Sequence, residues 1–279
     1  MRCDIGLVPT VRSLVILERL SLNAPMETLK IERQGPVAVV RLQKARGNAI
    51  DSALVDDLLK AVAGITADKE IRGVLLASGH PKLFSPGLDL VSLSAFDRPA
   101  MRQFMGRFAE MLWALYTLRR PVVAAVNGPA VAGGCVLALT ADYRVLKRGA
   151  PIGLNEVKVG VPLPWSVALL LRASVPPQAV AKVALLGRNF ADDEALGVGL
   201  ADEIAPEEGF EAACLERLQE FVEKDPHSLA VTKSYVRTLV VDEMRAREAY
   251  EMDSWLDGWF SDATRARMKE TVAALTKKG

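Results

Sequence analysis

The sequence predicts an α/β fold whose second half is mainly helical. In the first half, short apolar runs typical of strands alternate with stretches in which apolar residues recur at helical spacing. Alternation of strand and helix is the pattern of an α/β domain. After Pro164 the strand-like runs fade, and helical spacing continues toward the C-terminus. No internal repeat of fixed length is evident, which argues against a repeat protein.

The first half opens with a predicted β-hairpin. Leu29 and Ile31 alternate with charged residues, and Val37–Leu42 reads as the partner strand across a Gly-Pro turn. A helix follows, because Asp51 offers an N-cap before apolar residues at helical spacing. The later elements of this half are a buried strand at 73–77, a helix at 101–115 and a strand at 122–126.

The second half is predicted to be a series of helices. Trp255 and Trp259 stand one helical turn apart near its end, and we expect them to serve helix packing or a subunit interface. No low-complexity linker interrupts this part of the chain. The helices are predicted at 178–186, 192–196, 210–221, 228–252 and 261–275.

We divide the chain into an N-terminal extension at 1–25, an α/β core at 26–205 and a helical region at 206–279 that packs on the core or on a neighbouring subunit. Glu18 and Arg19 interrupt the apolar residues of the extension, which argues against a signal peptide. No Ser-Lys-Leu address is present, and cytoplasm is the expected location. The alternative is the mitochondrial matrix, which requires the extension to act as a transit segment.

The composition argues against several classes of function. The 279 residues carry a formal net charge of +1, which provides no basic face for a nucleic acid. Two histidines and three scattered cysteines offer neither zinc-ligand spacing nor a disulfide framework. No apolar run is long enough to cross a bilayer. We therefore expect no metal, no nucleic-acid partner and no membrane insertion.

Three segments contain residue types suited to chemistry. In the first, at 82–90, a Pro-Gly turn can leave the Leu88 amide unpaired, and Asp89 can cap the following helix. In the second, at 127–135, a loop of small residues leads into a helix whose first amides can hold developing negative charge. In the third, at 152–162, Glu156 stands in an apolar stretch, where burial would raise its pKa toward roughly 6 to 7. Taken singly, the first segment fits an ordinary turn better than a site, and the third fits a solvated loop carboxylate better than a buried base. The second fits tight helix packing as well as it fits a functional loop.

Taken together, in this order and at these separations, the segments resemble the crotonase (enoyl-CoA hydratase/isomerase) superfamily. The similarity runs from about Met26 to the C-terminus. The resemblance implies a crotonase-like spiral of β-β-α units with a helical C-terminal trimerisation region, assembled as a homotrimer or hexamer. It implies an acyl-CoA thioester substrate, with coenzyme A as part of the substrate and no separate cofactor. Further similar pieces are Arg46-Gly47-Asn48-Ala49 and residues 121–128, 201–204 and 226–233.

The resemblance also assigns site residues by position. It implies that the amides of Leu88 and Gly133 form an oxyanion hole and that Glu156 is the catalytic carboxylate. Coenzyme A carries phosphates, and Arg46 and Lys82 flank the matching loops as candidate cations. The substrate-binding residues expected in this way are Arg46, Ala49, Lys82, Ser85, Pro86, Gly87, Asp89, Leu90 and Val136.

Val136 is the most informative departure from the family pattern. Hydratases of the family carry a glutamate at this position in addition to the one matching Glu156, because water addition needs two groups. Shifting a double bond from the 3,4 to the 2,3 position needs one base, and the three segments are similar to those of Δ3,Δ2-enoyl-CoA isomerases. We therefore expect an enoyl-CoA isomerase. The alternatives are a hydratase or another crotonase-type reaction, and a non-catalytic acyl-CoA-binding protein.

Overall fold

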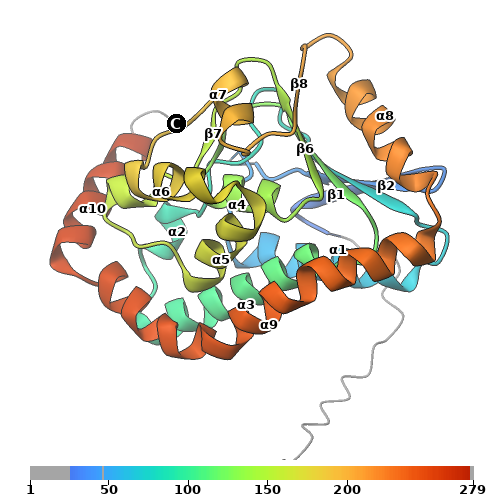
Figure 1. Cartoon of the computed structure of the whole chain (residues 1–279). Coiled ribbons are helices and arrows are strands. Elements are labelled where there is room, and N and C mark those ends of the chain that lie inside the picture. The colour runs from blue at the N-terminus through green and yellow to red at the C-terminus, as the bar shows by residue number, and fades with distance from the viewer. Residues whose placement is uncertain (1–25, 46, 277–279) are drawn as a thin grey trace, which may run out of the picture.

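A six-stranded sheet forms the centre of the fold (Figure 1). The computed structural model describes residues 26–45 and 47–276, so the predicted extension at 1–25 and Arg46 lie outside the described residues. β1 runs antiparallel to β2, and the other neighbouring pairs in this sheet are parallel. In sheet order the strands are β1 (Leu29–Gln34), β2 (Val37–Leu42), β3 (Gly73–Ser78), β4 (Val122–Val126), β6 (Tyr143–Lys147) and β8 (Glu203–Ala205).

Both faces of the sheet are buried. In β2, Val39 belongs to one apolar cluster and Val40 to the other, as the two-residue period of a strand requires. Helices α1 (Ser52–Ala67) and α3 (Arg98–Tyr116) contribute to the larger cluster, while α8 (Phe210–Val222) packs on the opposite face. The helical region after 205 therefore supplies one layer of the sheet's own core. The division of the chain at 205/206 stays a prediction.

The remaining helices gather on the α1 and α3 side of the sheet (Figure 1). α9 is 34 residues long and packs against α3 and α5 before the chain turns into α10. Within the described ranges, no helix combines the length and apolar character needed to cross a bilayer. The bounds are α2 (Leu90–Leu93), α4 (Gly133–Leu139), the 3₁₀ helix η1 (Glu156–Val159), α5 (Trp165–Ser174), α6 (Pro177–Leu186), α7 (Asp192–Gly197), α9 (Pro226–Trp259) and α10 (Asp262–Thr276).

Backbone pairings bring together the three segments that contain Leu88, Gly133 and Glu156. Short strands β5 (Ala130–Val131) and β7 (Ile152–Gly153) form a separate parallel pair, which joins the second segment to the third. An isolated bridge between Ser85 and Ala130 joins the first segment to the second, and another links Ile50 to Leu88. Segments some seventy residues apart in the sequence therefore meet at one place.

The hairpin, the predicted helices and the strands of the first half are confirmed. The expectation that strands fade after Pro164 is wrong at β8, a three-residue strand beside β6. The prediction also missed β6, since the polar Arg144 lies within its apolar pattern. This arginine is buried in an ion pair with Asp202 at 2.8 Å, so its charge does not mark a loop. α5 was missed because it follows closely spaced prolines in one apolar run.

Candidate active site

A cavity of about 760 Å³ lies where the three segments meet. Its volume falls within the range of ligand-binding pockets, and its walls are mainly apolar. Residues of the first half line it together with Val167 of α5, Trp259 of α9 and Thr271 of α10. The lining residues are Ala49, Pro86, Leu88, Asp89, Leu90, Val91, Met105, Phe108, Ala132, Gly133, Val136, Asn155, Glu156, Val159, Val161, Pro164, Val167, Trp259 and Thr271.

The loop of the first segment is held by buried polar contacts. The Asn48 side-chain amide donates to the Phe84 carbonyl oxygen at 2.9 Å, and the Ser85 hydroxyl donates to the Asn48 carbonyl oxygen at 2.8 Å. The Gly87 amide donates in turn to the Ser85 hydroxyl. Ser85 is completely buried and does not line the cavity. Ser85 therefore supports the loop. Its neighbours Pro86 and Leu88 line the cavity and can contact a ligand there.

Glycine is required where this loop meets the start of α4. Gly87 has φ of +95°, and a Cβ there would lie 2.9 Å from the Gly133 nitrogen. A Cβ on Gly134 would lie only 2.1 Å from the Ser85 carbonyl oxygen. Both contacts are too short for any side chain, which explains the Pro-Gly and Gly-Gly pairs of the sequence. The close approach brings the Leu88 and Gly133 backbones together at one wall of the cavity.

The amides of Leu88 and Gly133 donate no hydrogen bond within the part of the chain that the structure describes. Gly133 is the first residue of α4, where the helix itself offers no acceptor. Ala132, which precedes it, has a positive φ of 50°, a strained conformation for a residue with a side chain. Two unpaired amides next to a cavity can stabilise an oxyanion that forms between them.

Glu156 brings the third segment into the cavity. Glu156 as a whole is half-buried, but its Oε2 atom is fully enclosed and has no hydrogen-bond partner among the described residues. Burial raises the pKa of this carboxyl from 4.5 to about 7, against a smaller opposing effect of its own backbone amide. The group can therefore both accept and return a proton near neutral pH.

Asp89 is the other carboxylate of the cavity lining, and it is already engaged. Its side chain caps α2 by accepting from the Ser92 amide, as the sequence predicted. The Lys44 ammonium lies 3.7 Å from Asp89 and also pairs with Asp51. Asp89 is thus held as a structural anion, whereas Glu156 has no ion pair among the described residues.

The structure brings most of the predicted site residues to the cavity. Ala49, Pro86, Leu90 and Val136 line it beside the two amides and the two carboxylates. Ser85 and Gly87 support the loop from behind, and Lys82 is exposed outside the lining. Arg46 lies outside the described residues.

Sequence reasoning missed the part of the cavity wall supplied by later helices. Trp259 of α9 and Thr271 of α10 line it, although Trp259 was expected only to pack or to meet another subunit. Trp259 does also stack on Trp255, with ring centroids 5.2 Å apart. The Trp255 indole donates to the Pro162 carbonyl oxygen at 2.9 Å, which fixes α9 against the loop after η1. Nothing local in the sequence signals these long-range contacts.

Comparison with known proteins identifies the family. The model of the enoyl-CoA hydratase/isomerase family matches residues 32–272. The chain belongs to this family. The crystal structure of human mitochondrial delta3-delta2-enoyl-CoA isomerase superposes on the chain with a TM-score of 0.86 at 26% identity, covering 90% of this chain and 99% of that one.

Curated relatives of the family include both isomerases and a dehydratase. The human mitochondrial enoyl-CoA delta isomerase 1 is 32% identical over 245 residues, or 87% of this chain and 81% of the relative. A carnitinyl-CoA dehydratase of Salmonella typhi is 31% identical over 224 residues, covering 80% of this chain and 85% of the relative. The predicted crotonase resemblance is therefore confirmed, and the chain is an enzyme of the crotonase superfamily.

Proposed function

We propose that this crotonase-type enzyme is a Δ3,Δ2-enoyl-CoA isomerase with Glu156 as its single proton carrier. The observation that carries the proposal is the contrast between the two carboxylates of the cavity lining. Glu156 is unpaired with a pKa raised to about 7, whereas Asp89 is bound by Lys44 and the Ser92 amide. Val136 stands where hydratases of the family have their second glutamate, and it is buried in the cavity wall.

The proton shuttle follows from this arrangement. Ionised Glu156 takes a proton from carbon 2 of a 3-enoyl-CoA, and the electron pair of the broken C–H bond moves onto the thioester oxygen as a dienolate. The Leu88 and Gly133 amides stabilise that oxygen, with one such donor worth about 3 to 4 kcal/mol of barrier. Protonated Glu156 then delivers the proton to carbon 4, which leaves the double bond between carbons 2 and 3.

The apolar wall favours isomerisation over hydration. Val136 offers no group that could activate water, and the other described lining residues near it are largely apolar. Excluding water keeps the dienolate from side reactions and strengthens the hydrogen bonds to its oxygen. In the described part of the chain, no three His, Cys, Asp or Glu side chains gather as metal ligands do. The proposed reaction uses one carboxylate and two amides, with coenzyme A entering as part of the substrate.

The experiment measures trans-3-hexenoyl-CoA and crotonyl-CoA side by side. The isomerase proposal predicts fast conversion of the first substrate to its 2-enoyl isomer and slow or absent hydration of the second. Formation of 3-hydroxyacyl-CoA from crotonyl-CoA at the faster rate would instead establish a hydratase. Tight binding of both substrates without product would establish an acyl-CoA-binding protein.

We further propose that the subunits form a homotrimer or a hexamer. α9 presents one face of exposed apolar side chains, Tyr235, Val236, Leu239 and Tyr250, each at least 67% exposed. A second exposed apolar patch lies at Leu185 and Leu186 of α6. Two unlike patches suit a head-to-tail ring, in which one patch covers the other on the next subunit. Light scattering on the wild type and on Leu239→Asp tests this, with a smaller particle expected for the variant.

The proposed location is the cytoplasm. The isomerase relatives from human, mouse and rat are named as mitochondrial proteins, which supports the matrix as the alternative. That alternative depends on residues 1–25, which lie outside the described residues. Fusing these residues to a fluorescent protein and locating the fusion in cells distinguishes the two compartments.

A further inference from the structure

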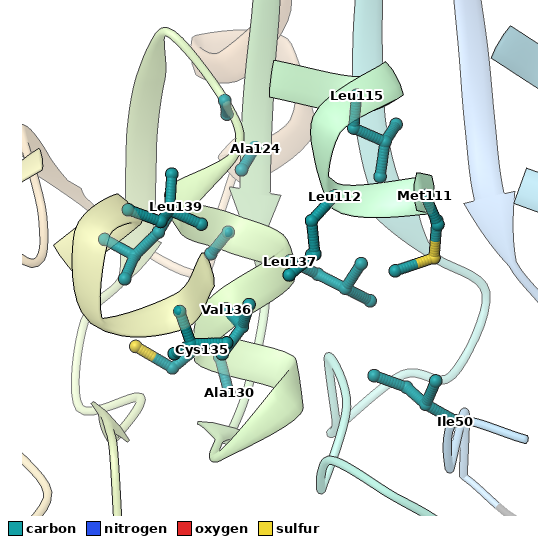
Figure 2. Packing of buried hydrophobic residues seen from close by; sticks show 14 of the residues in the cluster. Ile50, Met111, Leu112, Leu115, Ala124, Ala130, Cys135, Val136, Leu137 and Leu139 are labelled. Atoms are coloured by element: carbon teal, nitrogen blue, oxygen red, sulfur yellow. The ribbon is translucent and has the colours of Figure 1, made fainter. Parts of the chain in front are cut away.

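The helix that supplies the Gly133 amide is short and has no side-chain cap. α4 spans seven residues, and no side chain accepts a hydrogen bond at its N-terminus. Figure 2 shows Val136, Leu137 and Leu139 of α4 in the buried cluster together with Leu112 of α3. Apolar packing of this kind is non-directional, so it holds the helix sideways but fixes its position along the axis only weakly. Hydrogen bonds at the C-terminal end of α4 can therefore fix the position of the helix along its axis.

Arg237 of α9 supplies those bonds. Its guanidinium donates to the Thr140 carbonyl oxygen at 2.9 Å and to the Ala141 carbonyl oxygen at 2.9 Å, where α4 ends. It also donates to the Tyr116 carbonyl oxygen at 2.8 Å, at the end of α3, and lies over the Tyr116 ring. One planar cation thus joins the C-terminal ends of two helices that border the cavity.

The guanidinium is itself held from the other side. Asp142 pairs with Arg237 at 2.9 Å and with Lys233 at 2.5 Å, and it accepts from the Val122 amide of β4 at 2.7 Å. Lys233 donates in addition to the Arg120 carbonyl oxygen. Arg237 is thereby fixed relative to the central sheet, and so are the carbonyl groups that it binds.

We propose that Arg237 is a positioning residue for the oxyanion hole, acting through α4. The inference rests on the proposed function of the Gly133 amide. At 1.5 Å per residue, seven helical residues place the clamp roughly 10 Å from that amide, and a helix transmits such a constraint rigidly. Catalytic groups must be held to within about 0.5 Å, so a shift of α4 along its axis would weaken the bond to a dienolate oxygen. The cation also lies at the negative end of the α4 dipole, where it stabilises the helix.

The test compares Arg237→Lys and Arg237→Met with Lys233→Met as the matched control. Lys233 belongs to the same ionic cluster and lies one helical turn away, but it makes no bond to α4. Each variant is titrated with acetoacetyl-CoA, whose enolate absorbs in the near ultraviolet, and with a saturated acyl-CoA that forms no enolate. Thermal unfolding sets a working temperature at which all the proteins are folded.

The proposal predicts that Arg237→Met lowers kcat for trans-3-hexenoyl-CoA by about 10- to 100-fold, the cost of a misplacement near 1 Å. The bound enolate signal should fall in parallel, while the affinity for the saturated acyl-CoA changes by less than about threefold. Arg237→Lys should show a kcat and an enolate signal between those of Arg237→Met and the wild type. If Arg237→Met does not fold, Arg237→Lys is compared with Lys233→Met instead. Lys233→Met should keep both the wild-type kcat and the enolate signal.

Three results would overturn the inference, and they distinguish a failure of the role of Arg237 from a failure of the oxyanion hole. If the wild type stabilises the enolate and the Arg237 variants do so equally well, Arg237 serves stability alone. Equal losses in the Arg237 variants and Lys233→Met lead to the same conclusion. If the wild type itself shows no enolate signal, the oxyanion hole fails, and the role assigned to Arg237 fails with it.

Discussion

Two groups of buried polar residues lie at opposite ends of α4, and they differ in how their hydrogen bonds and ion pairs are satisfied. In the cavity, Glu156 has an enclosed carboxylate oxygen without a partner, and the nearby Gly133 amide is unpaired. In the cluster at the other end of α4, Asp142 binds both Lys233 and Arg237 together with a backbone amide. A buried polar group without a partner costs stability, whereas a fully paired cluster fixes neighbouring elements in place.

The groups in the cavity serve the chemistry, and the groups in the ionic cluster support the fold. The unpaired groups are free to bind a substrate and to exchange a proton, and the paired groups have no such freedom. Changes in the cavity should therefore alter turnover and relieve a cost in stability. Changes in the ionic cluster should lower stability, and Arg237, which binds the carbonyl groups at the end of α4, should affect turnover as well.

The largest expected effect follows Glu156→Gln. Removing the base should lower kcat for trans-3-hexenoyl-CoA by about 10³-fold, the typical contribution of a positioned acid–base group. Glu248→Gln is the matched control, because burial also raises the pKa of Glu248 but the Ser166 hydroxyl binds it and it lies outside the cavity lining. Steady-state kinetics of both variants measure the difference. Near wild-type turnover in Glu156→Gln would contradict the single-base account.

A loss of stability of about 3 to 5 kcal/mol is expected for Asp142→Asn, because the change leaves two buried cations without their counter-ion. Denaturant unfolding at neutral pH measures it. Asp253→Asn is the control, since its pairs with Arg98 and Arg102 are exposed and should cost less than about 1 kcal/mol. Equal effects of the two changes would show that burial of the cluster adds nothing.

Glu156→Gln should raise stability at alkaline pH. The folded pKa of Glu156 is about 7, above its ordinary 4.5, so the wild type is penalised once this carboxyl must ionise inside the fold. The penalty is absent below pH 4.5, grows as pH rises to 7 and then reaches about 3 kcal/mol. Unfolding curves at pH 4 and pH 8.5 should therefore agree at the lower pH and favour the variant at the higher one. An equal difference at both values would rule out ionisation as its cause.

The smallest effect is expected for Lys82→Ala. Lys82 is exposed and does not line the cavity, so its contact with the phosphates of coenzyme A would be a surface ion pair. KM should rise by no more than about threefold with kcat unchanged, and salt should reduce the difference. A rise above about tenfold in KM would place Lys82 directly on a phosphate.

Much of the fold could be predicted from local patterns. Asp51 and Asp89 act as the N-caps that their positions indicated, and the strands with clear apolar runs form as expected. β6 escaped prediction because the charge of Arg144 is neutralised by Asp202, which lies far along the chain. A local pattern carries no information about such a distant partner.

The candidate site was predictable only in part, for a related reason. The three segments identify Leu88, Gly133 and Glu156, but the sequence leaves open whether Glu156 is solvated or enclosed. Its burial depends on packing around η1, which no single segment determines. Met105 and Phe108 belong to the apolar stripe of α3 and are indistinguishable from core residues until the cavity beside them is seen. Arg237 likewise reads as a surface charge until its carbonyl partners are known.

Deuterium transfer in a single turnover tests the central claim most directly. trans-3-Hexenoyl-CoA labelled with deuterium at carbon 2 is mixed with excess enzyme in ordinary water, and the product is analysed for the label at carbon 4. If Glu156 alone carries the proton within a shielded cavity, a substantial fraction of the product retains deuterium at carbon 4, and Glu156→Gln yields almost none. Rapid conversion with no deuterium at carbon 4, unchanged in Glu156→Gln, would contradict the account.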